Sequence, residues 1–129
     1  REERDMQYFL LVGLGGALGA VARYSVNQLF LTYFNSLLLG TFLANVSGSF
    51  VLGLLIGLLS SHPNVPTEAR MFIAVGFLGS YTTFSTLSVA TIQLLQEGDM
   101  STAVVNLGAN IVLGLIAATI GLVVGRLVI

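Results

Sequence analysis

The sequence predicts an all-α integral membrane protein with four transmembrane helices in a single domain, residues 1–129. The first observation is composition: 55% of the residues are hydrophobic and only 9% are charged, whereas soluble domains carry about 25% charged residues. The second is that the hydrophobic residues form four blocks, each longer than the about 20 residues that cross a bilayer. No block alternates hydrophobic and polar residues, which excludes the strands of a membrane barrel.

Short polar segments separate the four blocks. Residues 60–66 contain both prolines and form the clearest loop. Thr67 and Glu68 follow Pro66 and are typical of a helix start. A turn is expected at residues 97–99. The predicted spans are residues 8–33, 37–59, 69–96 and 100–128.

The basic residues predict an orientation. Four spans place both termini on one side of the membrane, together with four of the five arginines, whereas the opposite loops contain none: Arg1, Arg4, Arg70 and Arg126. The positive-inside rule then places this side in the cytoplasm. The N-terminal residues are not typical of a cleaved signal peptide, because the hydrophobic block is too long.

Several classes of function are disfavoured by what the sequence lacks. It has no lysine and a net charge of −1, so nothing suggests a nucleic-acid partner. It has no cysteine, which excludes disulfides and thiolate metal sites. The spans contain no nucleophile–base pair and no cluster of metal ligands, so the protein is not expected to be an enzyme.

Arg23 is the one charged residue well inside a predicted span. A guanidinium at this depth normally faces protein or water. Two interpretations remain open: the side chain snorkels to an interface or forms structural hydrogen bonds, or it attracts an anion at a pore mouth. No Asp or Glu lies mid-span, and this absence favours an anion over a cation or a coupled proton.

Polar residues recur at helical spacing in the second and fourth blocks. Residues four apart share one face of a helix, and amide and hydroxyl protons can donate to an anion without a fixed charge. Alternatively, an asparagine can simply bond a neighbouring helix. The two stripes are Thr41, Asn45 and Ser49 in the second block and Asn106 and Asn110 in the fourth.

The third block predicts a helix broken mid-membrane. Residues 79–88 begin with Gly79 and contain six Ser and Thr residues. Unwound backbone at membrane depth survives only where it is buried in protein or lines water, and its free carbonyls can hold a cation. Within this run, Phe84 either packs in the core or presents its positive ring edge to an anion.

Glycines at GxxxG spacing predict close helix packing and need no chemical role. The pairs are Gly15 and Gly19, Gly53 and Gly57, and Gly121 and Gly125.

Three motifs together resemble the Fluc/CrcB family of fluoride channels. They are GGALGAVARY at residues 15–24, GTFLAN at residues 40–45 and GFLGSYTTFST at residues 76–86. The resemblance covers essentially the whole chain. It implies an antiparallel, dual-topology homodimer with two pores, which exports fluoride passively from the cytoplasm across a bacterial inner membrane.

The resemblance also implies roles for individual residues. Asn45 and Phe84 would line each pore, and Arg23 would lie near the vestibule. Backbone carbonyls of Gly79 and Thr82, from both subunits, would hold a central sodium ion. Hydroxyl and amide donors along the fluoride path would come from the remaining matched positions: Thr41, Ser85, Thr86, Asn106 and Asn110.

Two positions depart from the family pattern and keep rival interpretations open. Leu87 stands where the family usually has a second phenylalanine, and Ala90 where it usually has a glutamate. The chain could therefore be one subunit of a heterodimeric channel or a non-conducting membrane assembly subunit. A coupled transporter would need a titratable mid-membrane group, for which Arg23 is the sole candidate.

Overall fold

The computed structural model describes residues 1–128, and over that range it contains helices and no strand. The third span is built from several consecutive helical segments, of which η1 is a wider π-helix. The elements are α1 (Glu2–Phe34), α2 (Leu37–Ser61), α3 (Thr67–Arg70), η1 (Met71–Leu78), α4 (Gly79–Tyr81), α5 (Phe84–Gln96) and α6 (Met100–Leu127).

The prediction of four membrane spans is confirmed. Within the described residues, four helices are long and apolar enough to cross a bilayer: α1, α2, the interrupted rod Thr67–Gln96, and α6. The first helix starts six residues before the predicted span 8–33. Its first turn carries Glu2, Glu3 and Asp5, which favour a helix N-terminus because they oppose the helix dipole.

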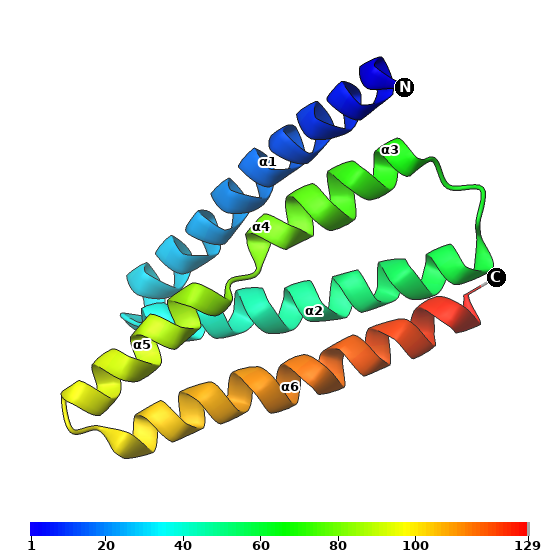
Figure 1. Cartoon of the computed structure of the whole chain (residues 1–129). Helices are drawn as coiled ribbons and strands as arrows, with labels where there is room; N and C mark the ends of the chain where they lie inside the picture. The colour runs from blue at the N-terminus through cyan, green and yellow to red at the C-terminus, as the bar shows by residue number, and fades with distance from the viewer. Residues whose placement is uncertain (129) are drawn as a thin grey trace.

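The spans lie side by side with both termini at one end (Figure 1). The loop between α2 and α3 lies at that same end, and the α1–α2 and α5–α6 connections lie at the other. At the α1–α2 connection, Asn35 adopts a left-handed conformation with φ 52°, which asparagine tolerates better than most residues. Ser36 then caps α2 by accepting a hydrogen bond from the Leu39 amide at 3.2 Å.

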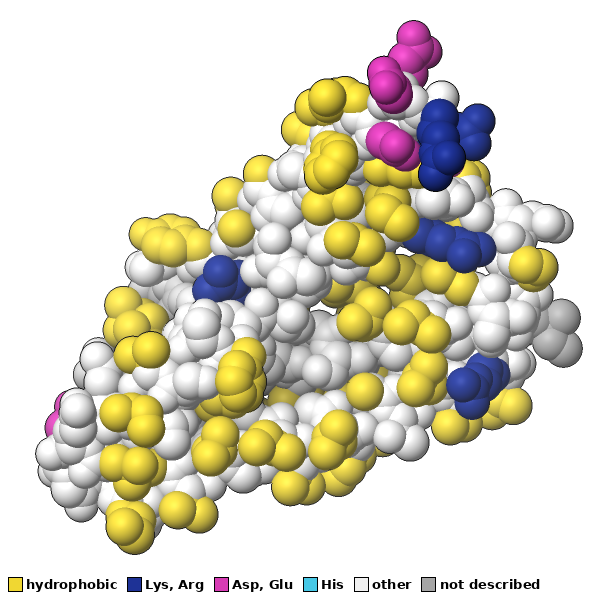
Figure 2. All heavy atoms as spheres, in the orientation of Figure 1, with side chains coloured by type: hydrophobic (Ala, Val, Ile, Leu, Met, Phe, Trp, Pro, Cys, Tyr) yellow, Lys and Arg dark blue, Asp and Glu magenta, His cyan; other side chains and the backbone are white. Residues whose placement is uncertain are grey.

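Hydrophobic side chains are spread over the face of the bundle seen in Figure 2. Among the described residues, the buried apolar side chains are only Ala44, Leu78, Leu87 and Ala103, while large residues on every span are more than half exposed, such as Phe9 and Leu115. A surface of this kind would aggregate in water. It is expected to face lipid or a second membrane protein.

Glycines set the two closest helix contacts, which confirms the packing prediction. On α6, an added Cβ at Gly121 would collide with the carbonyl of Phe50 on α2. On α2, an added Cβ at Gly53 would collide with the carbonyl of Ala118 on α6. In the same way Gly19 of α1 lies directly against the backbone of η1. The bundle is therefore two tightly packed pairs, α2 with α6 and α1 with η1.

Asp99 caps the N-terminus of α6. Its Oδ1 atom accepts hydrogen bonds from the Thr102 amide at 3.2 Å and the Ser101 hydroxyl at 3.3 Å. The hydrogen bonds from Thr102 lower the pKa of the Asp99 carboxyl below its ordinary value, because they stabilise the charged form.

This lowered pKa predicts a pH dependence of stability. A folded-state pKa below the unfolded value stabilises the fold above the unfolded pKa, about 3.9 for Asp, and the contribution is lost as pH falls through the folded pKa. The melting temperature in detergent should therefore fall as pH drops below about 4. Asp99→Asn keeps a good cap and should lose this part of the pH dependence. An identical pH profile for the two proteins would contradict the prediction.

Candidate functional site

The predicted break in the third span is present and lies between α4 and α5. Thr82 (φ −88°, ψ 154°) and Thr83 (φ −149°, ψ 121°) are both extended, and helix resumes at Phe84. Figure 1 shows the chain leaving its helical path here, beside the middle of α2. Two extended residues at membrane depth leave backbone groups that need partners.

Side chains from α1 and α2 supply those partners. The Thr83 amide donates to Asn45 Oδ1 at 2.8 Å, and Asn45 Nδ2 donates back to the Thr83 carbonyl at 3.1 Å. Arg23 Nε donates to the Ser80 carbonyl at 3.0 Å. On the far side of the break, the Thr83 hydroxyl oxygen caps α5 by accepting from the Thr86 amide at 3.3 Å. The break is thus a fixed feature held from both sides.

The same hydrogen bonds leave two backbone carbonyls without their helical donors. In an unbroken helix the Thr83 amide would donate to Gly79, and the Thr86 amide to Thr82. Here those amides donate to Asn45 and to the Thr83 hydroxyl instead. The freed carbonyls belong to the two residues for which the resemblance implies a cation. Carbonyl oxygens are the ligands that hard cations prefer.

The asparagines form a chain of hydrogen bonds across α2 and α6. Asn45 Nδ2 donates to Asn110 Oδ1 at 3.0 Å, and Asn110 Nδ2 donates to the Asn106 carbonyl at 2.8 Å. The Thr83 amide can only donate, so it fixes which way the Asn45 amide points. Both Asn45 amide protons are then engaged, one with Thr83 and one with Asn110.

Two open cavities flank the break. Cavity 1, of about 400 Å³, lies between α2, α5 and α6, and the predicted residues in its lining are Asn45, Ser49, Thr82, Phe84 and Asn110. Cavity 2, of about 460 Å³, lies between the start of α2 and α5, and the predicted residues in its lining are Thr41, Ser85 and Thr86. Asn106 lines neither and borders a third, smaller hollow of about 280 Å³.

Cavity 2 contains hydroxyl protons that the protein itself does not use. Several hydroxyls in the spans bond back to their own helix, as Ser88 does to the Phe84 carbonyl at 2.9 Å. Thr41 is only 6% exposed, yet among the described residues its hydroxyl has no protein partner. The Thr86 hydroxyl accepts from that of Thr83 at 3.1 Å, so its own proton stays free. Ser85 makes a longer contact of 3.3 Å with Thr83.

Four further residues bear on interpretations left open by the sequence. Phe84 is 75% exposed, so the core-packing interpretation is wrong for the single chain. Arg23 forms a structural hydrogen bond to the carbonyl of Ser80, in α4 just before the break. Of the two departures from the family pattern, Leu87 is buried and lines cavity 1, and Ala90 lines cavity 2.

Two features of the site were not predicted: the hydroxyl pair of Ser47 and Tyr81, and the position of Gln93 in the lining of cavity 2. Ser47 Oγ and the Tyr81 hydroxyl are 3.0 Å apart, joining α2 to α4. Gln93 lines cavity 2 two turns beyond Thr86. A seven-residue spacing from Thr86 would have placed Gln93 on that face, but no sequence signal pairs Ser47 with Tyr81.

The fold and the site together define a small multi-pass membrane protein with uncharged polar cavities at membrane depth. The chain matches the family described as CrcB-like protein, Camphor Resistance (CrcB), over residues 10–122. It belongs to this family.

Curated relatives match this chain along nearly their whole length. A fluoride-specific ion channel FluC of Acidobacterium capsulatum is 42% identical over 119 residues, which is 92% of this chain and 95% of the relative. A protein of the same name from Magnetococcus marinus is 43% identical and covers 91% and 96%. Another from Pyrococcus furiosus is 39% identical and covers 95% and 98%.

Proposed function

We propose that this chain is a passive, fluoride-selective channel that exports fluoride through two pores of an antiparallel homodimer. The relatives' names support the ion, and their class, ion channels, supports the view that the chain is not an enzyme. The observation that carries the proposal is cavity 2, whose free proton donors are uncharged. The acidic residues all lie outside the spans or at their ends, and none stands mid-membrane to repel an anion.

Fluoride is small and strongly hydrated, so a pore must replace its water with other donors. The hydroxyls of Thr41 and Thr86 supply such donors in cavity 2. The N-terminus of α5 begins at Phe84, and its helix dipole adds positive potential mid-membrane. The Arg23 guanidinium, which is bonded to the break through Nε, adds a full positive charge. Neither feature places a carboxylate on the path.

Asn45 and Phe84 have separate roles in this proposal. Asn45 lines cavity 1 and holds Thr83 and Asn110 in place through hydrogen bonds from its Nδ2 atom. As fluoride passes, one of these hydrogen bonds is replaced by a hydrogen bond to the ion. Phe84 offers the positive edge of its ring. Its exposure and the open side of cavity 1 favour a second copy of the chain as the covering wall.

We include in the proposal a structural sodium ion held by the freed carbonyls of Gly79 and Thr82, since hard cations prefer such oxygens. When bound, it would offset the cost of bringing an anion into a low-dielectric region. One chain offers two such carbonyls, and an antiparallel partner would offer two more. Sodium should therefore raise the melting temperature of the dimer at constant ionic strength, relative to N-methylglucamine. Equal melting temperatures would argue against the ion.

The direct test is efflux from liposomes that contain this chain alone, recorded with fluoride and chloride electrodes. We expect fluoride efflux to be at least about 100-fold faster than chloride efflux, because a site whose polar groups match one ligand discriminates strongly against another. An imposed proton gradient should leave the fluoride rate unchanged. Equal rates for both halides would overturn the selectivity, and a response to the gradient would favour a coupled transporter.

Thr41→Val removes a free hydroxyl and keeps the side-chain shape. We expect fluoride efflux to fall about tenfold, because the variant loses one hydrogen bond from a hydroxyl to the fluoride ion, and hydrogen bonds to charged groups are the stronger kind. Thr119→Val is the matched control, since the Thr119 hydroxyl bonds only the Leu115 carbonyl of its own helix. Equal losses in the two variants would mean that cavity 2 is not on the path.

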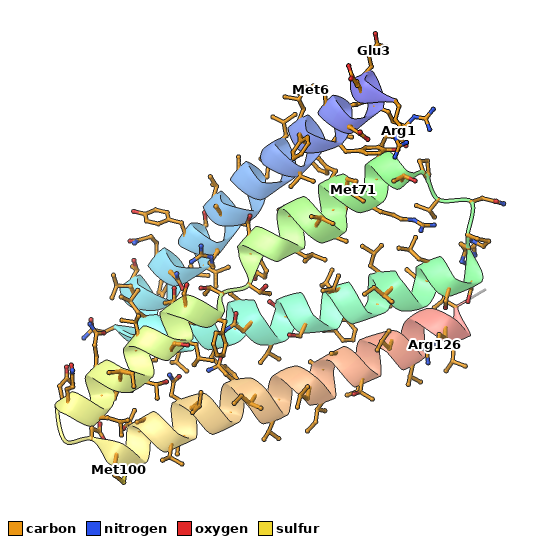
Figure 3. The ribbon with its side chains drawn as sticks, in the orientation of Figure 1. Arg1, Glu3, Met6, Met71, Met100 and Arg126 are labelled. Atoms are coloured by element: carbon orange, nitrogen blue, oxygen red, sulfur yellow. The ribbon has the colours of Figure 1, made fainter. Side chains whose placement is uncertain are left out.

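A second candidate is one subunit of a heterodimeric channel, and the arginine distribution favours it. Arg1 and Arg126 lie at the same end of the bundle, and Met100 lies at the other (Figure 3). Basic side chains gather toward that end in Figure 2. Such a bias favours insertion in one orientation, whereas a dual-topology homodimer needs both.

Cysteine labelling distinguishes the two candidates, because the chain has no native cysteine. Asn64→Cys reports the loop at the arginine end, and Glu97→Cys reports the opposite turn. An impermeant maleimide added to intact cells should label both variants if the homodimer has dual topology. Labelling of Glu97→Cys alone would mean a single orientation, and inert liposomes would then support the heterodimeric or non-conducting alternative.

A further inference from the structure

A hydrogen bond between Ser47 and Tyr81 ties the end of α4 to the middle of α2. The two hydroxyl oxygens are 3.0 Å apart, and both residues are partly buried. Tyr81 is the last helical residue before the extended pair Thr82 and Thr83. A contact at this position therefore holds the last helical residue before the break against α2.

The neighbouring residues seat the tyrosine ring. Next to Ser47, Gly48 has no side chain, and an added Cβ would lie 3.1 Å from Tyr81 Cδ2 and would collide with Thr82 Cγ2. On the other side the ring stacks on Phe77, with centroids 6.0 Å apart and an interplanar angle of 18°. Tyr81 and Thr82 thus lie directly on the bare backbone of α2.

We propose that Tyr81, through Ser47, is a positioning residue for the anion path. The bond fixes α4 on α2 just before the break, and Asn45 fixes Thr83 on α2 just after α4 ends. Thr83 in turn holds the hydroxyl of Thr86, which lines cavity 2. Losing the Tyr81 bond lets this segment shift, so the donors in cavity 2 no longer converge. The inference rests on the proposed channel function.

Tyr81→Phe is the cleanest test, because it leaves no stranded hydroxyl. Ser47 keeps a bond to the Ala44 carbonyl of its own helix at 3.4 Å, and the phenyl ring keeps its seat on Gly48. We expect fluoride efflux to fall about fivefold to tenfold, the size expected for one lost neutral hydrogen bond. The ratio of fluoride to chloride efflux should fall as well.

A double-mutant cycle shows whether the two hydroxyls act together. Ser47→Ala should reproduce the loss, and the double variant should be no worse than the more impaired single variant. Ser60→Ala is the control on the same helix. Within the described residues the Ser60 hydroxyl bonds only the Gly57 carbonyl, so this variant should keep the wild-type rate. Additive losses would overturn the proposal.

Amide hydrogen exchange tests the geometry without fluoride. Tyr81→Phe should speed exchange in the segment 80–86 and leave α6 unchanged. If wild-type liposomes carry no fluoride, the channel function fails, while this exchange result still tests the contact. If the variant exchanges like the wild type, or keeps the wild-type fluoride rate and halide ratio with only a lower melting temperature, Tyr81 does not position the path.

Discussion

Asn45→Asp should lower fluoride efflux by at least about 100-fold, the largest functional effect expected of any single substitution in this chain. Aspartate can still accept the Thr83 amide but cannot donate. The bonds to the Thr83 carbonyl and to Asn110 Oδ1, now 3.1 and 3.0 Å, become contacts between oxygens. A carboxylate would also stand beside the path of an anion in a low-dielectric region, where repulsion is strong.

Asn64→Asp is the matched control for that substitution. Asn64 lies in the exposed loop between α2 and α3, so the same change of amide to carboxylate there should leave efflux within twofold of wild type. Efflux is measured at equal protein density, with dimer content checked by size-exclusion chromatography. An Asn45→Asp channel that conducts like the control would remove Asn45 from the site.

Much of the fold was predictable because lipid constrains a sequence more strictly than water does. Block length and hydrophobicity alone gave the four spans, and the run of hydroxyl residues after Gly79 predicted the break. Both predictions rest on a physical requirement that holds at each position: backbone groups in lipid need partners. The start of α1 was missed, because residues 2–7 are mostly charged or polar and extend the helix beyond the hydrophobic block.

The partners of individual side chains were far less predictable. Helical spacing placed Asn45 on a polar face but said nothing of Thr83, which is 38 residues away. Arg23 and Ser80 are 57 residues apart. Such pairs depend on how two helices are rotated relative to each other and on where the third span breaks. The periodicity within one helix predicts neither. Residue type identified the candidate site, and only the structure separated engaged protons from free ones.

That separation changes how the candidate residues are ranked. The resemblance implies that Asn45 lines the pore and that Thr41 adds a hydroxyl donor along the path. In the structure both amide protons of Asn45 are engaged, whereas the hydroxyl of Thr41, a residue only 6% exposed, has no hydrogen bond within the described residues. Asn45 therefore couples the break to α6, and Thr41 is the better candidate for direct contact with the ion.

Gly121→Ala should strongly destabilise the fold, because no space exists for the added methyl group. The Cβ would collide with the Phe50 carbonyl and lie 2.8 Å from the Leu54 amide nitrogen, and both are backbone atoms that cannot rotate away. α2 and α6 would have to separate, and with them Asn45 and Asn110. Overpacking usually lowers the free energy of unfolding by about 1–3 kcal/mol. We expect a loss at the upper end of this range, because the neighbouring backbone atoms are rigid.

Gly108→Ala separates that collision from the general effect of replacing glycine in a helix. Gly108 is also on α6, but an added Cβ there meets nothing within 4 Å, and alanine has the higher helix propensity. Unfolding in mixed micelles should show a clear loss of stability for Gly121→Ala and none for Gly108→Ala. If both variants lost the same stability, the loss would come from glycine content, and close contact of α2 with α6 would not be what holds the asparagine chain together.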